Sequence, residues 1–164
     1  MAATVVIYEK NGAGGTTTDK TSGTVRFKNA DNSTVDLVNP LVKPGTGFDY
    51  SYEKWLRAGV TGGSFSQITG LVAYTDGANG FGAGVEMFWK SVATYATPAE
   101  ATGTTGYVDA FTYVSGTSLA LNAGTVVGTG QMGDHLVAFV RINGTTVSGG
   151  LTASETATIA WSEI

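Results

Sequence analysis

The chain has 164 residues, a net charge of −4 and an isoelectric point near 4.8. Only 13% of its residues are charged, against roughly 25% in an average globular protein, and its 24 glycines are about twice the usual share. The absence of cysteine excludes disulfides and thiolate metal sites, and the acidic balance argues against nucleic-acid binding, while no signal peptide or membrane-spanning apolar run is evident.

This length predicts a single domain over residues 1–164. Residues 4–9 are rich in β-branched side chains and predict a first strand. The Gly- and Thr-rich stretch 11–23 predicts a flexible loop, because it holds no apolar side chain larger than alanine. Alternation of apolar and polar residues predicts a strand over 24–28, and a shorter strand follows at 34–38.

Three aromatic residues spaced two apart, Phe48, Tyr50 and Tyr52, predict a strand that places all of them on one face. Trp55, which follows, has the opposite parity, so its side chain would point to the other face of the strand. We therefore expect a bulge or bend near Lys54, with a short helical turn over 52–58 as the alternative.

The middle of the chain predicts two strands, over 65–74 and 85–92, which the Gly-rich loop 76–84 would join as a hairpin. Residues 107–114 alternate in polarity and predict another strand. A short one follows at 118–121.

The C-terminal third predicts a strand over 134–142, a turn at Asn143-Gly144 and a final alternating strand over 156–162. We expect these two strands to form paired structure, with the last one held inside a sheet. About ten short strands and no amphipathic helix predict an all-β fold. The architecture expected is a single-domain β-sandwich or jelly roll of antiparallel strands.

His135 is the only histidine, so a Ser-His-Asp arrangement would have to include it. We predict instead a polar residue at the edge of a strand. One histidine without cysteine cannot supply the usual zinc ligands. The sequence thus offers no catalytic, cofactor-binding or metal-binding residue that we can name, and no cofactor is expected.

Three glycine-rich or acidic patterns are candidates for a functional site. Residues 80–84 resemble a phosphate-binding glycine loop, but the spacing is wrong and a strand follows where a helix is required. Asp76 and Asn79 could hold Ca²⁺, but the EF-hand pattern is missing, and we predict a turn. Asp49 and Glu53 could form a glycosidase pair only at a separation that sequence does not supply.

Six aromatic residues could build a sugar-stacking platform, although core or subunit interface is the commoner role. They are Phe48, Tyr50, Tyr52, Trp55, Phe88 and Trp89. The two sequons, at Asn32 and Asn143, are predicted to be turns.

Residues 128–142 and 154–163, together with residues 68–77 and 84–85, resemble virion structural proteins of tailed bacteriophages. These ranges hold 37 of the 164 residues, and the resemblance lies in sheet hairpins with characteristic turns. His135 departs from it, standing where an aromatic residue is commoner.

The resemblance implies a capsid decoration or cement protein: a small β-sandwich that binds the major capsid protein on the outer lattice and forms a homo-oligomer, a trimer. The expected location is the virion surface, after synthesis in the host bacterial cytoplasm. An acidic chain without a basic arm suits the outside of a DNA-filled shell. No enzymatic activity, nucleic acid or membrane is expected. The alternatives are a head-fibre or tail module that binds host-surface glycans, and a tail or neck subunit.

Overall fold

The structure, a computed structural model, describes residues 2–146 and 154–164. It confirms the all-β prediction, with antiparallel sheets built from ten strands in the described part of the chain. The strands are β1 (Ala3–Asn11), β2 (Thr16–Asp19), β3 (Phe48–Tyr50), β4 (Lys54–Gly63), β5 (Ile68–Tyr74), β6 (Val85–Val92), β7 (Val108–Asp109), β8 (Leu119–Ala120), β9 (Gly130–Asn143) and β10 (Thr158–Glu163). A single 3-10 turn, η1 (Ala110–Thr112), follows β7.

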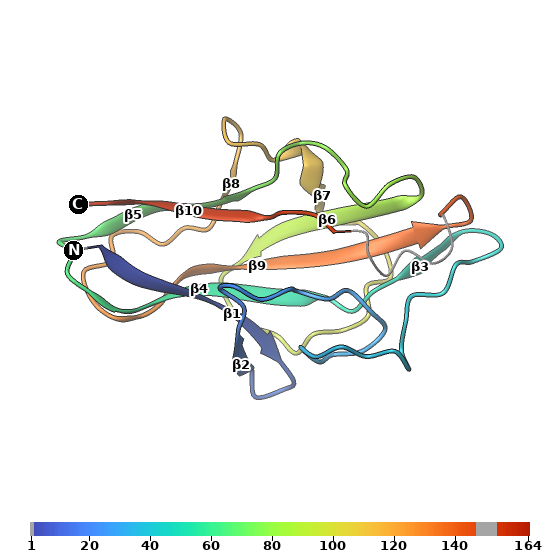
Figure 1. The fold of residues 1–164 in the computed structure, drawn as a ribbon, viewed down its shortest axis with the longest axis horizontal. Coiled ribbons are helices and arrows are strands. Elements are labelled where there is room, and N and C mark those ends of the chain that lie inside the picture. Colours follow the sequence, from blue (N-terminus) through green and yellow to red (C-terminus); the bar gives the residue numbers. More distant parts are fainter. Residues whose placement is uncertain (1, 147–153) are drawn as a thin grey trace.

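The larger sheet has seven strands in the order β2-β1-β4-β9-β6-β7, with β3 also paired to β9, and the smaller has the order β10-β5-β8. In Figure 1 both chain termini lie at one end of the molecule, beside β5 and β10. The segment that leads into β3 lies at the opposite end.

The larger sheet is covered on both faces. One face packs against the smaller sheet through a core that includes Leu56, Leu71 and Trp89. On the other face Phe88 and Phe139 stack with ring centroids 5.3 Å apart, and Tyr107 meets Phe139 edge-on at 4.7 Å. Because both faces are buried, β9 reads as a nearly continuous apolar run rather than as an alternating one.

Two predicted strands in the first third are wrong. Residues 24–28 and 34–38 belong to an irregular segment between β2 and β3, although Val25 and Phe27 still pack against the core. No neighbouring strand pairs with this segment, and side chains hold its backbone instead. Conversely, the expected loop 11–23 contains β2, which forms a hairpin with β1.

The region around Lys54 is a break between β3 and β4, as the bend prediction required, and the alternative helical turn over 52–58 is wrong. Both predicted hairpins are also wrong. The strands β5 and β6 lie in different sheets, and so do β9 and β10. The strand over 107–114 shrinks to β7 followed by η1.

The C-terminal strand β10 docks on a sheet as expected, but it is an edge strand that pairs with β5. Its placement follows from packing, because Ile159 and Trp161 bury their side chains against the core from the smaller sheet. Pairing with β9 would have put them on the other layer.

Gly133 lets the two sheets approach each other. It lies in β9 at a register shift opposite β4, with φ of +68°. A Cβ atom at this position would lie 2.4 Å from the Leu121 carbonyl oxygen and 2.6 Å from Leu71 Cδ2. Neither contact is possible for a real side chain, so glycine is required both by conformation and by space.

We therefore predict that Gly133→Ala lowers the free energy of unfolding by about 2 kcal/mol or more, since the left-handed backbone and the contact with Leu121 both disfavour a side chain. Urea unfolding followed by circular dichroism measures this loss. Gly116→Ala is the matched control, because a Cβ there would meet no atom within 4 Å. Equal stabilities for the two variants would contradict the prediction.

Candidate interaction surface

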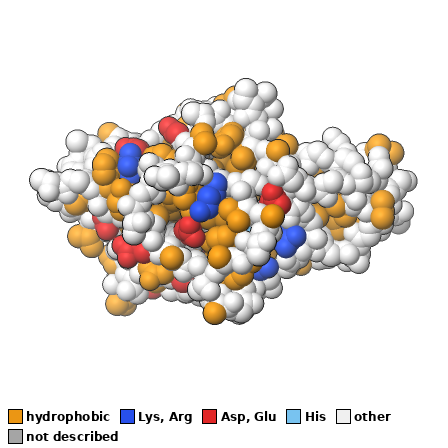
Figure 2. Space-filling view, turned by 180° about the vertical axis from the view of Figure 1, so that it is seen from behind, with side chains coloured by type: hydrophobic (Ala, Val, Ile, Leu, Met, Phe, Trp, Pro, Cys, Tyr) orange, Lys and Arg blue, Asp and Glu red, His pale blue; other side chains and the backbone are white. Residues whose placement is uncertain are grey.

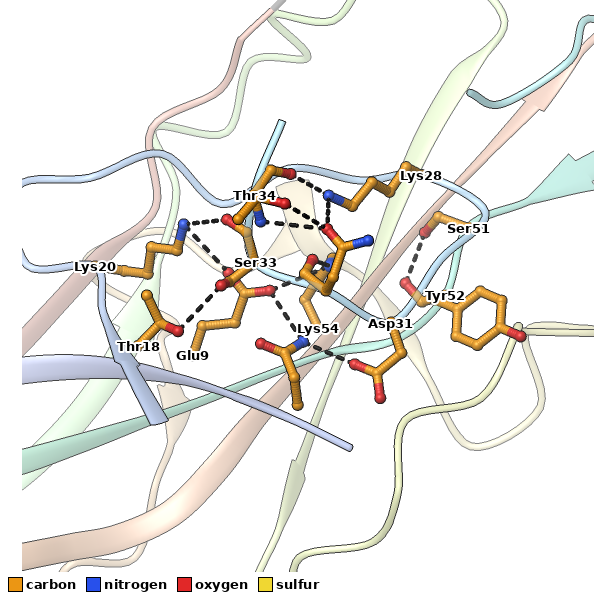
Figure 3. A network of polar contacts seen from close by, with 12 residues as sticks. Glu9, Thr18, Lys20, Lys28, Asp31, Ser33, Thr34, Ser51, Tyr52 and Lys54 are labelled. Carbon is orange, nitrogen blue, oxygen red and sulfur yellow. Dashed lines mark hydrogen bonds and ion pairs between the residues drawn. The ribbon is translucent and has the colours of Figure 1, made fainter. Parts of the chain in front are cut away.

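Three lysines hold the segment that precedes β3 by its backbone (Figure 3). Lys54 donates to the Asn32 carbonyl at 2.8 Å and Lys20 to the Ser33 carbonyl at 2.7 Å. Lys28 donates to the next carbonyl, that of Thr34. Three successive carbonyl groups, which no strand pairs, thus each accept a hydrogen bond from an ammonium group.

The carboxylate of Glu9 lies beneath this arrangement and balances part of its charge. Its Oε1 atom lies 3.1 Å from Lys54 Nζ, and its Oε2 atom lies 3.6 Å from Lys20 Nζ. The Glu9 and Lys54 side chains are both 0% exposed. A buried charge is costly unless it is paired and hydrogen-bonded. The Oε1 atom meets both conditions, whereas Oε2 is paired with Lys20 but accepts no hydrogen bond from the described residues.

Further polar contacts fasten the same segment to the β1–β2 hairpin. The Asp31 carboxylate accepts hydrogen bonds from Asn11 Nδ2 and from the Gly12 amide, each at 2.7 Å. The hydroxyl groups of Thr18 and Ser33 lie 3.0 Å apart. Residues 31–33 of the segment are thus bound to the β1–β2 hairpin of the larger sheet.

Asp36 shapes the tip of the segment. Its carboxylate accepts hydrogen bonds from Asn39 Nδ2, Asn32 Nδ2 and the Val38 amide, at 2.8, 3.1 and 2.9 Å. These bonds, the one from the Asn39 side chain first, lower the pKa of Asp36 to about 2. The carboxylate therefore stays ionised at neutral pH and faces its own turn.

The outward side of this segment and of β3 is apolar. Five of the eight large apolar residues that are exposed in the described chain belong to it. We call this set the apolar loop, and its members are Val35, Leu37, Val38, Val42 and Phe48. A rigidly held group of exposed apolar side chains is typical of a surface that meets another molecule.

The rest of the surface is sparsely charged. On the face shown in Figure 2, acidic and basic side chains are dispersed among neutral and apolar ones, and no continuous basic patch is present. This agrees with the composition, in which Thr, Ser, Gly and Ala replace most of the usual charges.

His135 lies inside the fold, and its prediction as a polar strand-edge residue is wrong. It is 1% exposed within β9, and its ring lies 5.5 Å from that of Trp55 and 5.8 Å from that of Tyr95. Its Nδ1 atom lies 3.1 Å from the Val92 carbonyl oxygen, which requires a proton on Nδ1. Its Nε2 atom is buried and has no partner among the described residues.

The other candidate residues are engaged in local structure. The side-chain oxygens of Asp76 and Asn79 accept hydrogen bonds from the amides two residues on, as in a turn, and residues 80–84 lead into the strand β6. Asp49 accepts a bond from the Val42 amide, whereas Glu53 accepts bonds from Trp55 Nε1 and the Tyr107 hydroxyl. The structure therefore does not join Asp49 and Glu53 in one polar cluster.

The aromatic residues of the proposed sugar platform are mostly internal. Trp55, Phe88 and Trp89 are 3%, 9% and 1% exposed. Phe48 is exposed, but Arg141 lies over its ring, with the guanidinium carbon 3.9 Å from the centroid. No flat aromatic platform results from these six side chains.

The two sequons form turns, as predicted. Asn32 Oδ1 accepts hydrogen bonds from the amide and hydroxyl of Thr34, and Asn143 Oδ1 does the same with Thr145. Within residues 2–146 and 154–164, no group of three or more His, Asp or Glu residues could hold a metal ion. In the same residues no helix is long and apolar enough to cross a membrane.

We predict that Lys54→Met lowers the free energy of unfolding by about 3–5 kcal/mol, because it leaves Glu9 buried without its nearest cation. Chemical denaturation measures the change. The double variant Lys54→Met with Glu9→Leu should recover part of the loss, since the stranded carboxylate is then gone. A double variant that loses the sum of the two single losses would contradict the account.

A second prediction concerns acid stability. Burial, with smaller effects from Arg57 and Lys10, lowers the pKa of His135, while the bond to the Val92 carbonyl opposes the shift. The unfolded chain, with a histidine pKa of about 6.5, therefore takes up the proton more readily. The buried, neutral His135 therefore adds to the free energy of unfolding above about pH 6.5, and this contribution is lost as the pH falls below that value.

The free energy of unfolding, measured in urea between about pH 7 and pH 5, should consequently decrease more steeply for the natural chain than for His135→Phe. Phenylalanine suits the aromatic surroundings of this position and does not titrate. Identical slopes in the two proteins would rule out His135 as the titrating group.

Comparison of the chain with models of protein families, with curated proteins and with solved structures gave no match.

Proposed function

We propose that this protein is a non-enzymatic structural component of a bacteriophage particle, a capsid decoration protein that stabilises the lattice by contacts between subunits. The observation that carries the proposal is the apolar loop. Its side chains are exposed, yet the backbone just before Val35 is anchored by Lys20 and Lys28, which bind the Ser33 and Thr34 carbonyls. Such a preorganised surface loses little conformational entropy when it binds.

The distribution of charge supports the same proposal. With 13% charged residues, the chain offers few charges that must be desolvated when its surface is covered. Its net charge of −4 suits the outside of a DNA-filled shell, where a basic protein would be drawn to the packaged nucleic acid. Many weak contacts on a lattice then act together through avidity.

The phage assignment itself derives from the resemblance of residues 128–142, 154–163 and 68–77. These residues contain most of β9 and all of β5 and β10, which are framework strands. The resemblance therefore concerns the scaffold, and the apolar loop lies outside it. We expect the framework strands to be common to virion proteins and the apolar loop to be specific to this chain. This division is compatible with a decoration protein that is adapted to its own capsid.

The test is to mix the purified chain with undecorated capsids of the cognate phage and to pellet the capsids. We expect the chain to co-sediment at a fixed ratio to the major capsid protein and to raise the temperature at which the capsids open. An unrelated acidic protein of similar size should stay in the supernatant. Failure to co-sediment and no gain in heat resistance would contradict the proposal, and binding to isolated tails alone would favour a tail or neck position.

A further inference from the structure

We infer that copies of this chain associate head to tail, with the apolar loop of one copy seated in an acidic hollow of the next. The inference deepens the proposed function and rests on it for the symmetric assembly. The hollow has a volume of about 340 Å³, and its lining includes Glu53, Glu100, Thr102, Thr105 and Tyr107.

The projecting side of the contact is cationic as well as apolar. Of the four basic residues between positions 20 and 47, Lys20 and Lys28 bind backbone carbonyls of the segment itself. The other two, Arg26 and Lys43, are exposed. The two acids in this range, Asp31 and Asp36, bond to groups of the protein itself. Lys43 is exposed next to Val42 and forms no ion pair with any described residue. The apolar loop thus presents aliphatic side chains beside an available positive charge.

The receiving side has the opposite charge. Two carboxylates, Glu53 and Glu100, are among the residues that line the hollow, and none of the lining residues is basic. Glu100 is exposed in the hollow and has no ion pair within the described chain, whereas Glu53 is partly neutralised by Lys90 at 3.4 Å. Close by in sequence, Val108 is 45% exposed and adds apolar surface. A cationic apolar projection and an anionic hollow are complementary in charge.

The two surfaces are separate patches that share no residue. Phe27 and Leu41, near the apolar loop in sequence, pack on the core that also holds the smaller sheet. Tyr107 of the hollow packs on Phe139, on the other face. The contact therefore joins two different patches and is heterologous, and it closes into a ring when the rotation between copies permits.

A second copy is the occupant that these charges favour, because every copy carries one projection and one hollow of opposite sign. A partner with a neutral surface would leave Lys43 and Glu100 without charged partners.

The experiment is sedimentation velocity on the purified chain without capsids. The natural chain should form an oligomer that weakens with added salt. The loop variant Leu37→Asp with Val38→Asp, and the hollow variant Glu100→Lys, should each sediment as monomers. A mixture of the two should form a dimer that grows no further, because each retains the half of the contact that the other lacks. The changes are on the surface, and circular dichroism verifies that all variants fold.

Charge reversal gives a second readout. Lys43→Glu should weaken association by about tenfold or more, and its combination with Glu100→Lys should restore it. The control is Val127→Asp, since Val127 is as exposed as Leu37, at 72% against 71%, but lies outside the apolar loop. A monomeric natural chain, a mixture that fails to associate, or an equal effect of Val127→Asp would each overturn the inference.

Failures of the two proposals are distinguishable. A chain that forms the oligomer but does not pellet with capsids would refute the decoration role alone. A monomeric chain that pellets with capsids, and loses this binding with the loop variant, would show that the apolar loop contacts the capsid and not a second copy.

Discussion

The burial of Glu9 against lysine side chains is the constraint on which the rest of the structure depends. A buried carboxylate is costly unless cations lie close to it. Lys54 and Lys20 lie 3.1 and 3.6 Å from the Glu9 carboxylate oxygens, and both also bind backbone carbonyls. The ion cluster thus replaces the β-ladder that the segment before β3 lacks. An irregular segment is thereby held in place, and the apolar side chains on its outer side stay exposed.

The framework and the contact surfaces come from different parts of the chain. The strand β9 is covered on both faces, by the smaller sheet on one and by aromatic side chains such as Tyr107 on the other. Surfaces available to a partner are therefore supplied by irregular segments, which a rigid scaffold positions. The apolar loop and the hollow around Glu100 are both of this kind, and each depends on residues that pack on the larger sheet.

The sequence predicted the fold class and several individual strands well, because local alternation and glycine-rich turns determine them. The strand β6 has the predicted bounds, 85–92. Strand pairing was predicted poorly, since the partner of β10 is decided by packing between layers that no local pattern encodes. The lysine cluster was missed, although a signal existed: in β1, Glu9 has the parity of Val5 and Ile7, which face the core. The burial of His135 gave no such signal, because Tyr95, which packs beside it, belongs to a loop with little periodicity.

Amide hydrogen exchange followed by NMR measures how rigidly the segment before β3 is anchored. The amides of Asn29, Val38 and Val42 donate to the Asn39 carbonyl, to Asp36 and to Asp49. We expect all three amides to exchange well below the rates of an unstructured peptide. Exchange of all three at unstructured rates, while the amides of β9 remain protected, would contradict this anchoring.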